Sequence, residues 1–292
     1  PGNVKGSCYL LLASFFGAVM GALIKYVGQR INVFEILFIR QLFVLLFVFP
    51  VILANLRTVF QTNIFRFHLL RSVFSTIAMT AGFTALIHMP LAEVTAISFV
   101  RTLFATLLAI IFFREIVGLR RWITTIVGFL GVLIVVRPDS DNINYYAFLA
   151  IFSAFFVACI TLILKKLSRV DRPSTIIGYQ SIFILNFLLG PAIFFWVHPS
   201  ILDIIYISVI GCLMSMLQWL LINAFKVGDV GAIAPMEYTR LIFSTIIGAI
   251  FFSEIPSLWT GLGAIIIIGS SFYTVRRNLI LRKERGTKDI QQ

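Results

Sequence analysis

Ten apolar runs, each long enough to cross a bilayer, follow one another along the 292 residues with short connections between them. A spanning helix needs roughly 20 mostly apolar residues. Apolar segments of this length cross as helices, because the bilayer core offers no water to backbone polar groups. The runs lie near 5–26, 34–54, 66–88, 91–113, 121–137, 145–166, 173–196, 201–226, 230–252 and 257–276. The sequence therefore predicts an all-α membrane protein of ten transmembrane helices.

The composition agrees with burial in lipid. Hydrophobic residues make up 60% of the chain and charged residues 12%, against roughly 25% charged in a typical soluble domain. A soluble protein needs polar cover for its surface, whereas a protein in a bilayer does not. The first run is interpreted as a helix and not a signal peptide, because no small-residue cleavage site follows it.

The chain carries 24 Lys and Arg against 12 Asp and Glu, a formal charge of +12. No basic patch is interleaved with aromatic residues, so we expect no nucleic-acid partner. With both termini in the cytoplasm, 17 basic residues lie on the cytoplasmic side, and Lys25, Arg30 and Arg137 lie on the other. Because cytoplasmic loops carry the excess of Lys and Arg, we expect a plasma-membrane (bacterial inner-membrane) protein with both termini cytoplasmic.

Several chemistries have no matching pattern in the sequence. The three Cys are odd in number and lack CxxC spacing, and the three His form no cluster, so we expect no disulfide, metal or cofactor. The spans lack paired carboxylates or an activated Ser, which argues against an enzyme. A phosphate-binding loop of the GxxxxGK type is absent, which argues against direct ATP drive. A channel is a lower-ranked alternative, because repeated polar rings are missing.

The chain resembles itself when it is shifted by 139 residues. The matched positions are Arg101 with Arg240, Thr106 with Thr245, Gln41 with Gln180, and 111–116 with 250–255. Each copy holds five helices, and an odd number means that the second copy enters the membrane from the opposite side. We therefore predict two inverted five-helix repeats over 1–140 and 141–277, followed by a cytoplasmic basic tail over 278–292.

Specific motifs add a family resemblance. They are 85–96, with Pro90, Glu93 and Thr95; Phe112–Glu115; 128–138; 228–241, with Pro235, Glu237 and Arg240; and Phe252–Glu254. These stretches resemble the drug/metabolite transporter superfamily, EamA type, over nearly the whole chain. The resemblance implies export or exchange of amino acids, nucleotide-related metabolites, carboxylates or drugs.

Arginines inside the apolar runs are the most informative single residues. Arg101 is ten residues into its run, about 15 Å deep at about 1.5 Å per residue, and Arg240 has the matching depth. A charge at this depth costs roughly 2.5–3.5 kcal/mol on insertion scales. Two such side chains facing a cavity would suit an anionic substrate, since Arg grips carboxylate or phosphate bidentately. The alternative is that each is paired inside the protein.

Glu237 is the only acidic residue near the middle of a span. It lies three residues before Arg240, so a static salt bridge on one helix face is available. Without a close cation, burial would favour its protonated form and make it a proton-coupling candidate. Tyr238 offers a hydroxyl or a stacking face to a substrate.

Further polar and aromatic positions are weaker candidates for substrate contact. They are Arg71, Arg40, Tyr179, Gln180 and Trp219. Arg40 would line an outer vestibule with Lys25 and Glu35, or belong to a salt-bridged rim. Polar amides such as Gln180 are alternatively interhelical contacts.

Two pairs of residues are assigned to structure. Gly17 and Gly21 form a small-residue packing motif, which favours close helix packing over dimerisation. Glu115 and Glu254 follow corresponding runs and are expected to cap the next turn or to pair with a neighbour. The expected protein is a monomer or homodimer in the lipid bilayer.

Together these features predict a secondary active transporter, an exporter or exchanger (antiport) for a small organic metabolite. The substrate is expected to be anionic or zwitterionic, carboxylate or amino-acid-like. It is expected to bind at a midplane site between the repeats and to be transported by alternating access. The alternative is a cationic or mixed-charge metabolite such as S-adenosylmethionine, held by Glu237 and an aromatic cage.

Overall fold

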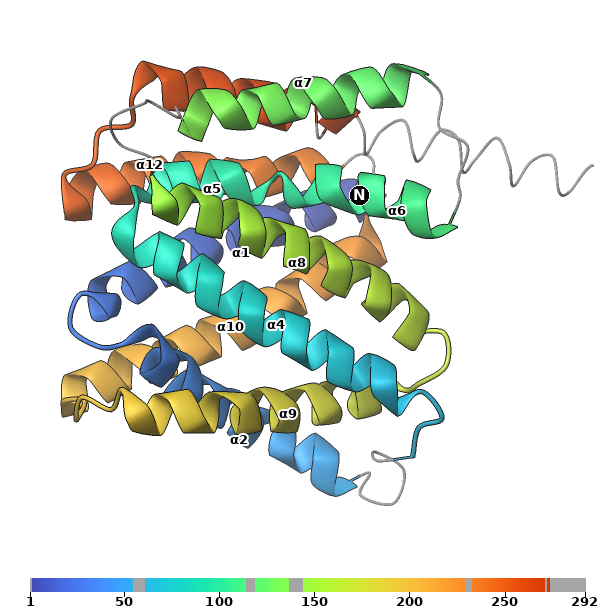
Figure 1. Ribbon diagram of the computed structural model, residues 1–292, viewed down its shortest axis with the longest axis vertical. Helices are drawn as coiled ribbons and strands as arrows, with labels where there is room; N and C mark the ends of the chain where they lie inside the picture. The colour runs from blue at the N-terminus through green and yellow to red at the C-terminus, as the bar shows by residue number, and fades with distance from the viewer. Residues whose placement is uncertain are drawn as a thin grey trace, which may run out of the picture. The chain divides into compact units, whose positions relative to one another are not determined.

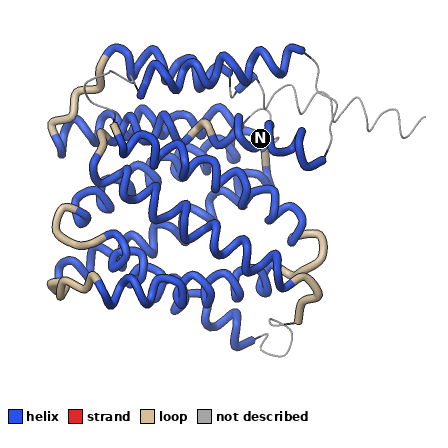
Figure 2. Tube along the Cα trace, in the orientation of Figure 1, coloured by secondary structure: helices blue, strands red, loops and turns tan. Residues whose placement is uncertain are grey.

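The computed structural model describes residues 2–54, 61–113, 119–136, 144–228, 233–270 and 272–273. Within these ranges every regular element is a helix, as Figure 2 shows. Figure 1 shows α1 (Gly2–Gly28), α2 (Val33–Ala54), α4 (Phe65–His88), α5 (Leu91–Ser98), α6 (Arg101–Phe113), α7 (Leu119–Val136), α8 (Tyr145–Leu167), α9 (Pro173–Phe194), α10 (Ile201–Val227) and α12 (Thr239–Phe252). The 3-10 helix η1 (Ala234–Tyr238) precedes α12, and a further helix covers Leu258–Ser270.

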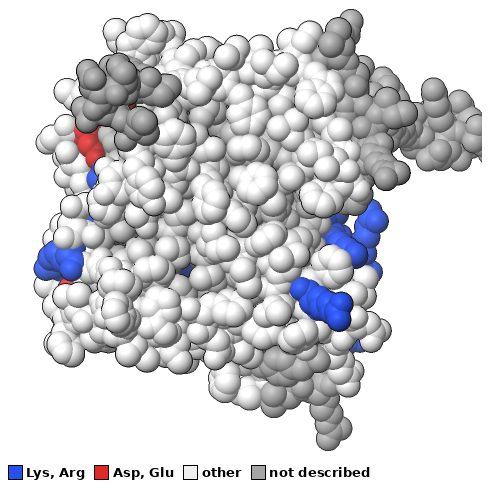
Figure 3. All heavy atoms as spheres, viewed as in Figure 1, with Lys and Arg blue, Asp and Glu red and all other residues white. Residues whose placement is uncertain are grey.

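The prediction of an all-helical protein is confirmed, and each of the ten apolar runs contains a helix within the residues that the structure describes. Six segments among the described residues have the length and composition to cross a membrane: Asn3–Gly28, Phe65–His88, Leu91–Phe112, Tyr145–Leu167, Pro173–Phe194 and Ile201–Val227. Trp122–Val136 and Leu258–Ser270 are shorter apolar helices. Charged side chains are sparse on the face drawn in Figure 3, as a lipid-facing surface requires.

Two runs that the sequence suggested as single helices are broken. Between α5 and α6, Phe99 and Val100 donate to the carbonyls three residues back, at 3.2 and 3.0 Å, which is a tighter 3-10 turn. The Ser98 hydroxyl donates to the Thr95 carbonyl at 2.7 Å beside this turn. The second break is η1, which contains Pro235, a residue without a backbone N–H. Arg101 follows one break and Arg240 follows the other.

The chain forms two compact units, and each draws helices from both predicted repeats. Unit 1 comprises 1–18, 90–144 and 217–292, and unit 2 comprises 19–89 and 145–216. Each unit therefore combines segments that lie far apart in the sequence, and neighbouring segments of the chain alternate between the two units.

In unit 2, α4 packs against α8 and α9, and α2 packs against α9. Leu37 of α2 lies in a buried core with Ile184 and Leu188 of α9. A corresponding pair of helices, the second of each predicted repeat, thus packs together within the unit.

Unit 2 also gathers helix ends that the sequence places on one side of a membrane. At the predicted outer side the contacts are Lys25 Nζ to the Met89 carbonyl, Arg30 with Asp203, and the Val197 N–H to Glu35 Oε2 at 3.0 Å. At the predicted cytoplasmic side, Asp171 Oδ2 accepts from Thr62 and contacts His68 Nε2, each at 2.7 Å. An up-and-down path through a bilayer requires this grouping of ends.

In unit 1, α5 and α12 lie side by side (Figure 1) and antiparallel. Residue numbers rise along one helix as they fall along the other. The contacting pairs are Leu91 N–H with Glu254 Oε2 at 2.8 Å, Thr95 Oγ1 with Ser244 Oγ at 3.0 Å, Phe99 with Tyr238 at 4.9 Å between ring centroids, and Arg101 with Glu237. The fourth run of one predicted repeat therefore faces the fourth run of the other in opposite directions.

Candidate functional site

The two helix breaks of unit 1 are joined by an ion pair. Arg101 Nη2, at the first residue of α6, donates to Glu237 Oε1 in η1. About a third of each side chain remains exposed, 33% for Arg101 and 35% for Glu237. A small polar molecule that reaches this point meets both a guanidinium and a carboxylate.

The sequence offered Arg240, on the same helix, as one possible partner for Glu237. The structure instead pairs its carboxylate with Arg101, from the opposite repeat. Helix α1 supports η1 at the same level, where the Ser14 hydroxyl lies 3.1 Å from the Met236 carbonyl and 3.3 Å from that of Glu237. Glu237 is thus held from two elements, α1 and α6.

Arg240 lies against α1. Its Nη2 donates to the Gly17 carbonyl at 3.3 Å, and its buried Nε has no hydrogen-bond partner within the part of the chain that the structure describes. A Cβ on Gly17 would lie 3.1 Å from that Nε and 3.3 Å from Cζ. Gly17, predicted as a packing residue, therefore leaves room for the Arg240 guanidinium.

Aromatic side chains accompany these charges. The Tyr238 ring packs edge-on against Phe99, at an interplanar angle of 72°. On the shift of 139 residues, Phe99 and Tyr238 are corresponding positions, so this contact joins equivalents. Trp219, also in unit 1, packs edge-on against Tyr9 at 6.1 Å and keeps an exposed ring.

The remaining predicted residues belong to unit 2. Arg40 is buried; its Nη2 donates to Gln41 Oε1 at 3.0 Å, and its guanidinium lies 5.7 Å from the Phe83 ring centroid. Lys25 and Glu35, expected beside Arg40 in a vestibule or rim, contact the Met89 carbonyl and the Val197 N–H. These contacts anchor loops.

Arg71, Tyr179 and Gln180 lie elsewhere in unit 2. Arg71 is buried, and its Nε lacks a hydrogen-bond partner among the described residues. The Tyr179 ring lies 4.8 Å from the His68 ring, and Gln180 is partly buried.

Sequence reasoning missed the contact between His68 and Asp171. His68 is 1% exposed and its Nε2 lies 2.7 Å from Asp171 Oδ2. The two residues are 103 positions apart and follow no motif. Only the common placement of the start of α4 and the loop before α9 would have suggested the contact.

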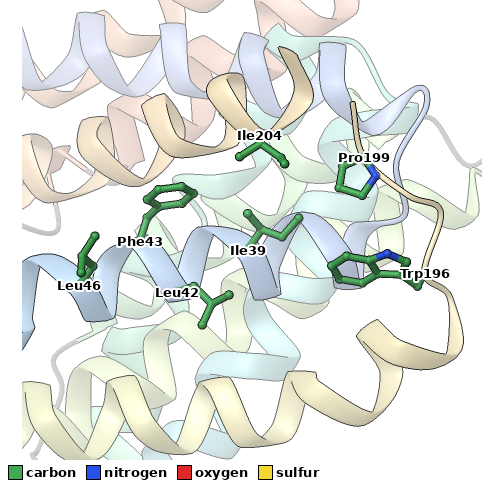
Figure 4. Close-up of a pocket in the computed structure, with 7 residues that line it drawn as sticks. All are labelled: Ile39, Leu42, Phe43, Leu46, Trp196, Pro199 and Ile204. Carbon is green, nitrogen blue, oxygen red and sulfur yellow. The ribbon is translucent and has the colours of Figure 1, made fainter. Parts of the chain in front are cut away.

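A pocket of about 430 Å³ in unit 2 has a different character. Figure 4 shows its lining from α2, α10 and the loop before α10: Ile39, Leu42, Phe43, Leu46, Trp196, Pro199 and Ile204. This lining is apolar and includes none of the predicted substrate residues. Among the described residues, no group of three or more His, Cys, Asp or Glu is placed to hold a metal ion.

A bundle of apolar helices that carries ion-paired and buried arginines is typical of an integral membrane protein. The model of the EamA-like transporter family matches residues 4–137 and 144–276. The chain therefore belongs to the EamA-like transporter family, as its motifs predicted, and it is a membrane transporter and not an enzyme.

Relatives with named activities align over nearly their whole length. An S-adenosylmethionine uptake transporter of Rickettsia prowazekii (strain Madrid E) is 28% identical over 272 residues, 93% of this chain and 92% of the relative. A riboflavin transporter of Vibrio cholerae serotype O1 is 28% identical over 291 residues, 97% of each.

A solved crystal structure shares the fold. Its TM-score is 0.61 at 14% sequence identity, and the match covers 92% of this chain and 97% of that one.

Proposed function

We propose that this protein is a secondary active transporter, an exporter or exchanger, for a small organic metabolite that is anionic or zwitterionic. The observation that carries the proposal is the meeting of Arg101, Glu237 and Tyr238 at two helix breaks, with Arg240 one turn away. Broken helices inside a membrane protein are tolerated where they line a cavity, and they are typical of transporter binding sites.

An inverted repeat is part of the same proposal, with ten membrane crossings and repeats over 1–140 and 141–277. Three observations support it. The family model matches the chain twice, the α5–α12 pair is antiparallel, and Phe99 contacts its own equivalent, Tyr238. Two similar halves supply the two states of similar energy that alternating access needs.

The second candidate substrate is S-adenosylmethionine, which combines a carboxylate with cationic groups. The Rickettsia relative favours it, and so does the presence of a carboxylate among the arginines. Glu237 would then meet the cationic part beside the Tyr238 and Phe99 rings, because aromatic faces attract cations. Proton coupling by Glu237 stays a prediction, and its ion pair with Arg101 favours the static alternative.

Uptake into proteoliposomes tests the function directly. The purified protein should take up one of a panel of labelled metabolites with saturable kinetics, and the panel should contain carboxylates, amino acids, S-adenosylmethionine and riboflavin. Arg101→Ala or Arg240→Ala should lower kcat/KM by about tenfold or more, because each removes a charge-assisted contact.

Competition separates the substrate classes. Inhibition by carboxylates and amino acids supports the first candidate, and inhibition by cationic metabolites alone favours a substrate held by Glu237. Unchanged transport by both arginine variants would contradict the assignment of Arg101 and Arg240 to the substrate site. Flux proportional to concentration over the whole range would indicate a channel.

A further inference from the structure

Near the two helix breaks of unit 1, the antiparallel contact sets a register between the chain around Ser98–Arg101 and the chain around Glu237–Arg240. Arg101 pairs with Glu237, and Thr95 contacts Ser244. Three positions back from Arg101 is Ser98, and three positions forward from Glu237 is Arg240. Extending this register by three residues in each direction matches Ser98 with Arg240.

The same two residues correspond by the internal repeat. On the shift of 139 residues, Arg101 matches Arg240 and Ser98 matches Glu237. The counterpart of the Arg101–Glu237 ion pair is thus Arg240 opposite Ser98. Serine stands where the other repeat has glutamate, so one of the two symmetric carboxylates is missing.

The contacts of Arg240 agree with the absence of a carboxylate at position 98. Within the described residues its guanidinium donates to the Gly17 carbonyl and forms no ion pair, and its Nε has no partner. The Ser98 hydroxyl donates along its own helix to Thr95. Arg101, Glu237 and Arg240 together carry one net positive charge, which one added carboxylate would neutralise.

We propose that a carboxylate of the substrate binds Arg240 beside Ser98, in the place that the Glu237 carboxylate takes at Arg101. This inference rests on the proposed transport function and narrows its substrate class to molecules with a free carboxylate. Arg binds a carboxylate through two parallel N–H···O bonds, whereas an ester leaves it without a charged partner. The asymmetry between the repeats thus creates the binding site.

The test supplies the missing carboxylate from the protein. Ser98→Glu restores the symmetric ion pair and should block substrate, while Ser98→Gln adds the same volume without charge. Uptake of amino acids and S-adenosylmethionine into proteoliposomes is measured for wild type and both variants. The carboxyl methyl ester of each transported probe is the competitor.

Wild type should take up the acids, and Ser98→Glu should lose at least about tenfold more uptake than Ser98→Gln, with esters competing at least about tenfold more weakly than the acids. Equal uptake by the two variants, or equal competition by ester and acid, would overturn the proposal.

Thermal unfolding of the ligand-free protein tests the pairing of residue 98 with Arg240 independently of transport. Ser98→Glu should unfold at a higher temperature than Ser98→Gln, and the difference should disappear in an Arg240→Gln background. If wild type transports no probe, the proposed function fails, while the melting comparison still decides whether residue 98 faces Arg240. A melting difference that persists without Arg240 would contradict the pairing.

Discussion

A charged guanidinium is tolerated inside a membrane protein when polar groups of the protein replace the water molecules that would hydrate it. Arg101 has a carboxylate, Arg240 a backbone carbonyl, and Arg40 an amide and an aromatic ring. These are different solutions to the same desolvation problem. At the residue scale, Arg240 differs from Arg101 in that its contact is a backbone carbonyl and not a carboxylate. This difference is the basis for placing a substrate carboxylate at Arg240.

The Arg101–Glu237 pair should behave as a coupled unit. Either single substitution, Arg101→Gln or Glu237→Gln, leaves a partly buried charge without its partner and should lower the melting temperature. A double-mutant cycle should give a coupling of about 1 kcal/mol, within the range of about 0.5–3 kcal/mol for contacting residues. Additive effects of the two substitutions on thermal unfolding would mean that the pair does not form in the folded protein.

Gly17→Ala should weaken substrate binding with little loss of fold. The new Cβ lies 3.1 Å from Arg240 Nε, so the guanidinium has to move by a few tenths of an ångström. We expect KM to rise by about threefold to tenfold, since 1.4 kcal/mol corresponds to about tenfold in affinity.

Gly261→Ala is the matched control for this substitution, because a Cβ on Gly261 meets nothing within 4 Å. Equal KM values for the two alanine variants would show that Gly17 makes no room that Arg240 needs.

At the scale of elements, the start of α5 in unit 1 depends on a group from a distant part of the chain. The N-terminus of α5 follows Pro90, a residue with no side-chain cap. Glu254, beyond the end of α12, supplies the acceptor for the Leu91 N–H. Its predicted structural role, pairing with a neighbour, is thus seen at a distant helix. Glu115, its equivalent, lies outside the described residues.

Glu254→Gln tests this remote cap. It keeps an acceptor but removes the charge that stabilises the positive end of α5. We expect a loss of about 0.3–1 kcal/mol, measured as a lower melting temperature, and a larger loss for Glu254→Ala. If Glu254→Ala unfolds like wild type, α5 does not need the cap.

The elements and the site were predictable from sequence to different degrees. Apolar length alone located the ten helical runs, because lipid leaves few alternatives to a helix. The breaks at Phe99 and in η1 were missed, since hydropathy does not distinguish a 3-10 turn from an α-helical turn. Arg101, Glu237 and Arg240 were found because charge is rare in such runs. Their pairing was not, because it depends on which helix lies opposite.

At the scale of the molecule, transport requires opposite ends of the helices to face opposite sides of one membrane. Arg30 and Asp203 mark one end of unit 2, and His68 and Asp171 mark the other. The positive-inside rule predicts that the second end faces the cytoplasm.

Cysteine labelling in intact cells tests that orientation. In a background without Cys8, Cys159 and Cys212, His198→Cys should react with a membrane-impermeant maleimide from outside. Ser168→Cys should react only after the membrane is permeabilised. The reverse pattern would mean that the termini face outward.

The central claim is that the paired helix breaks bind substrate in a protein that opens to one side at a time. Counterflow in proteoliposomes measures this most directly. Preloading with an unlabelled transported metabolite should accelerate uptake of the labelled one in wild type, and this stimulation should be lost in Arg240→Ala. Uptake that does not saturate and is unchanged by preloading would contradict alternating access. Full stimulation in Arg240→Ala would contradict the site.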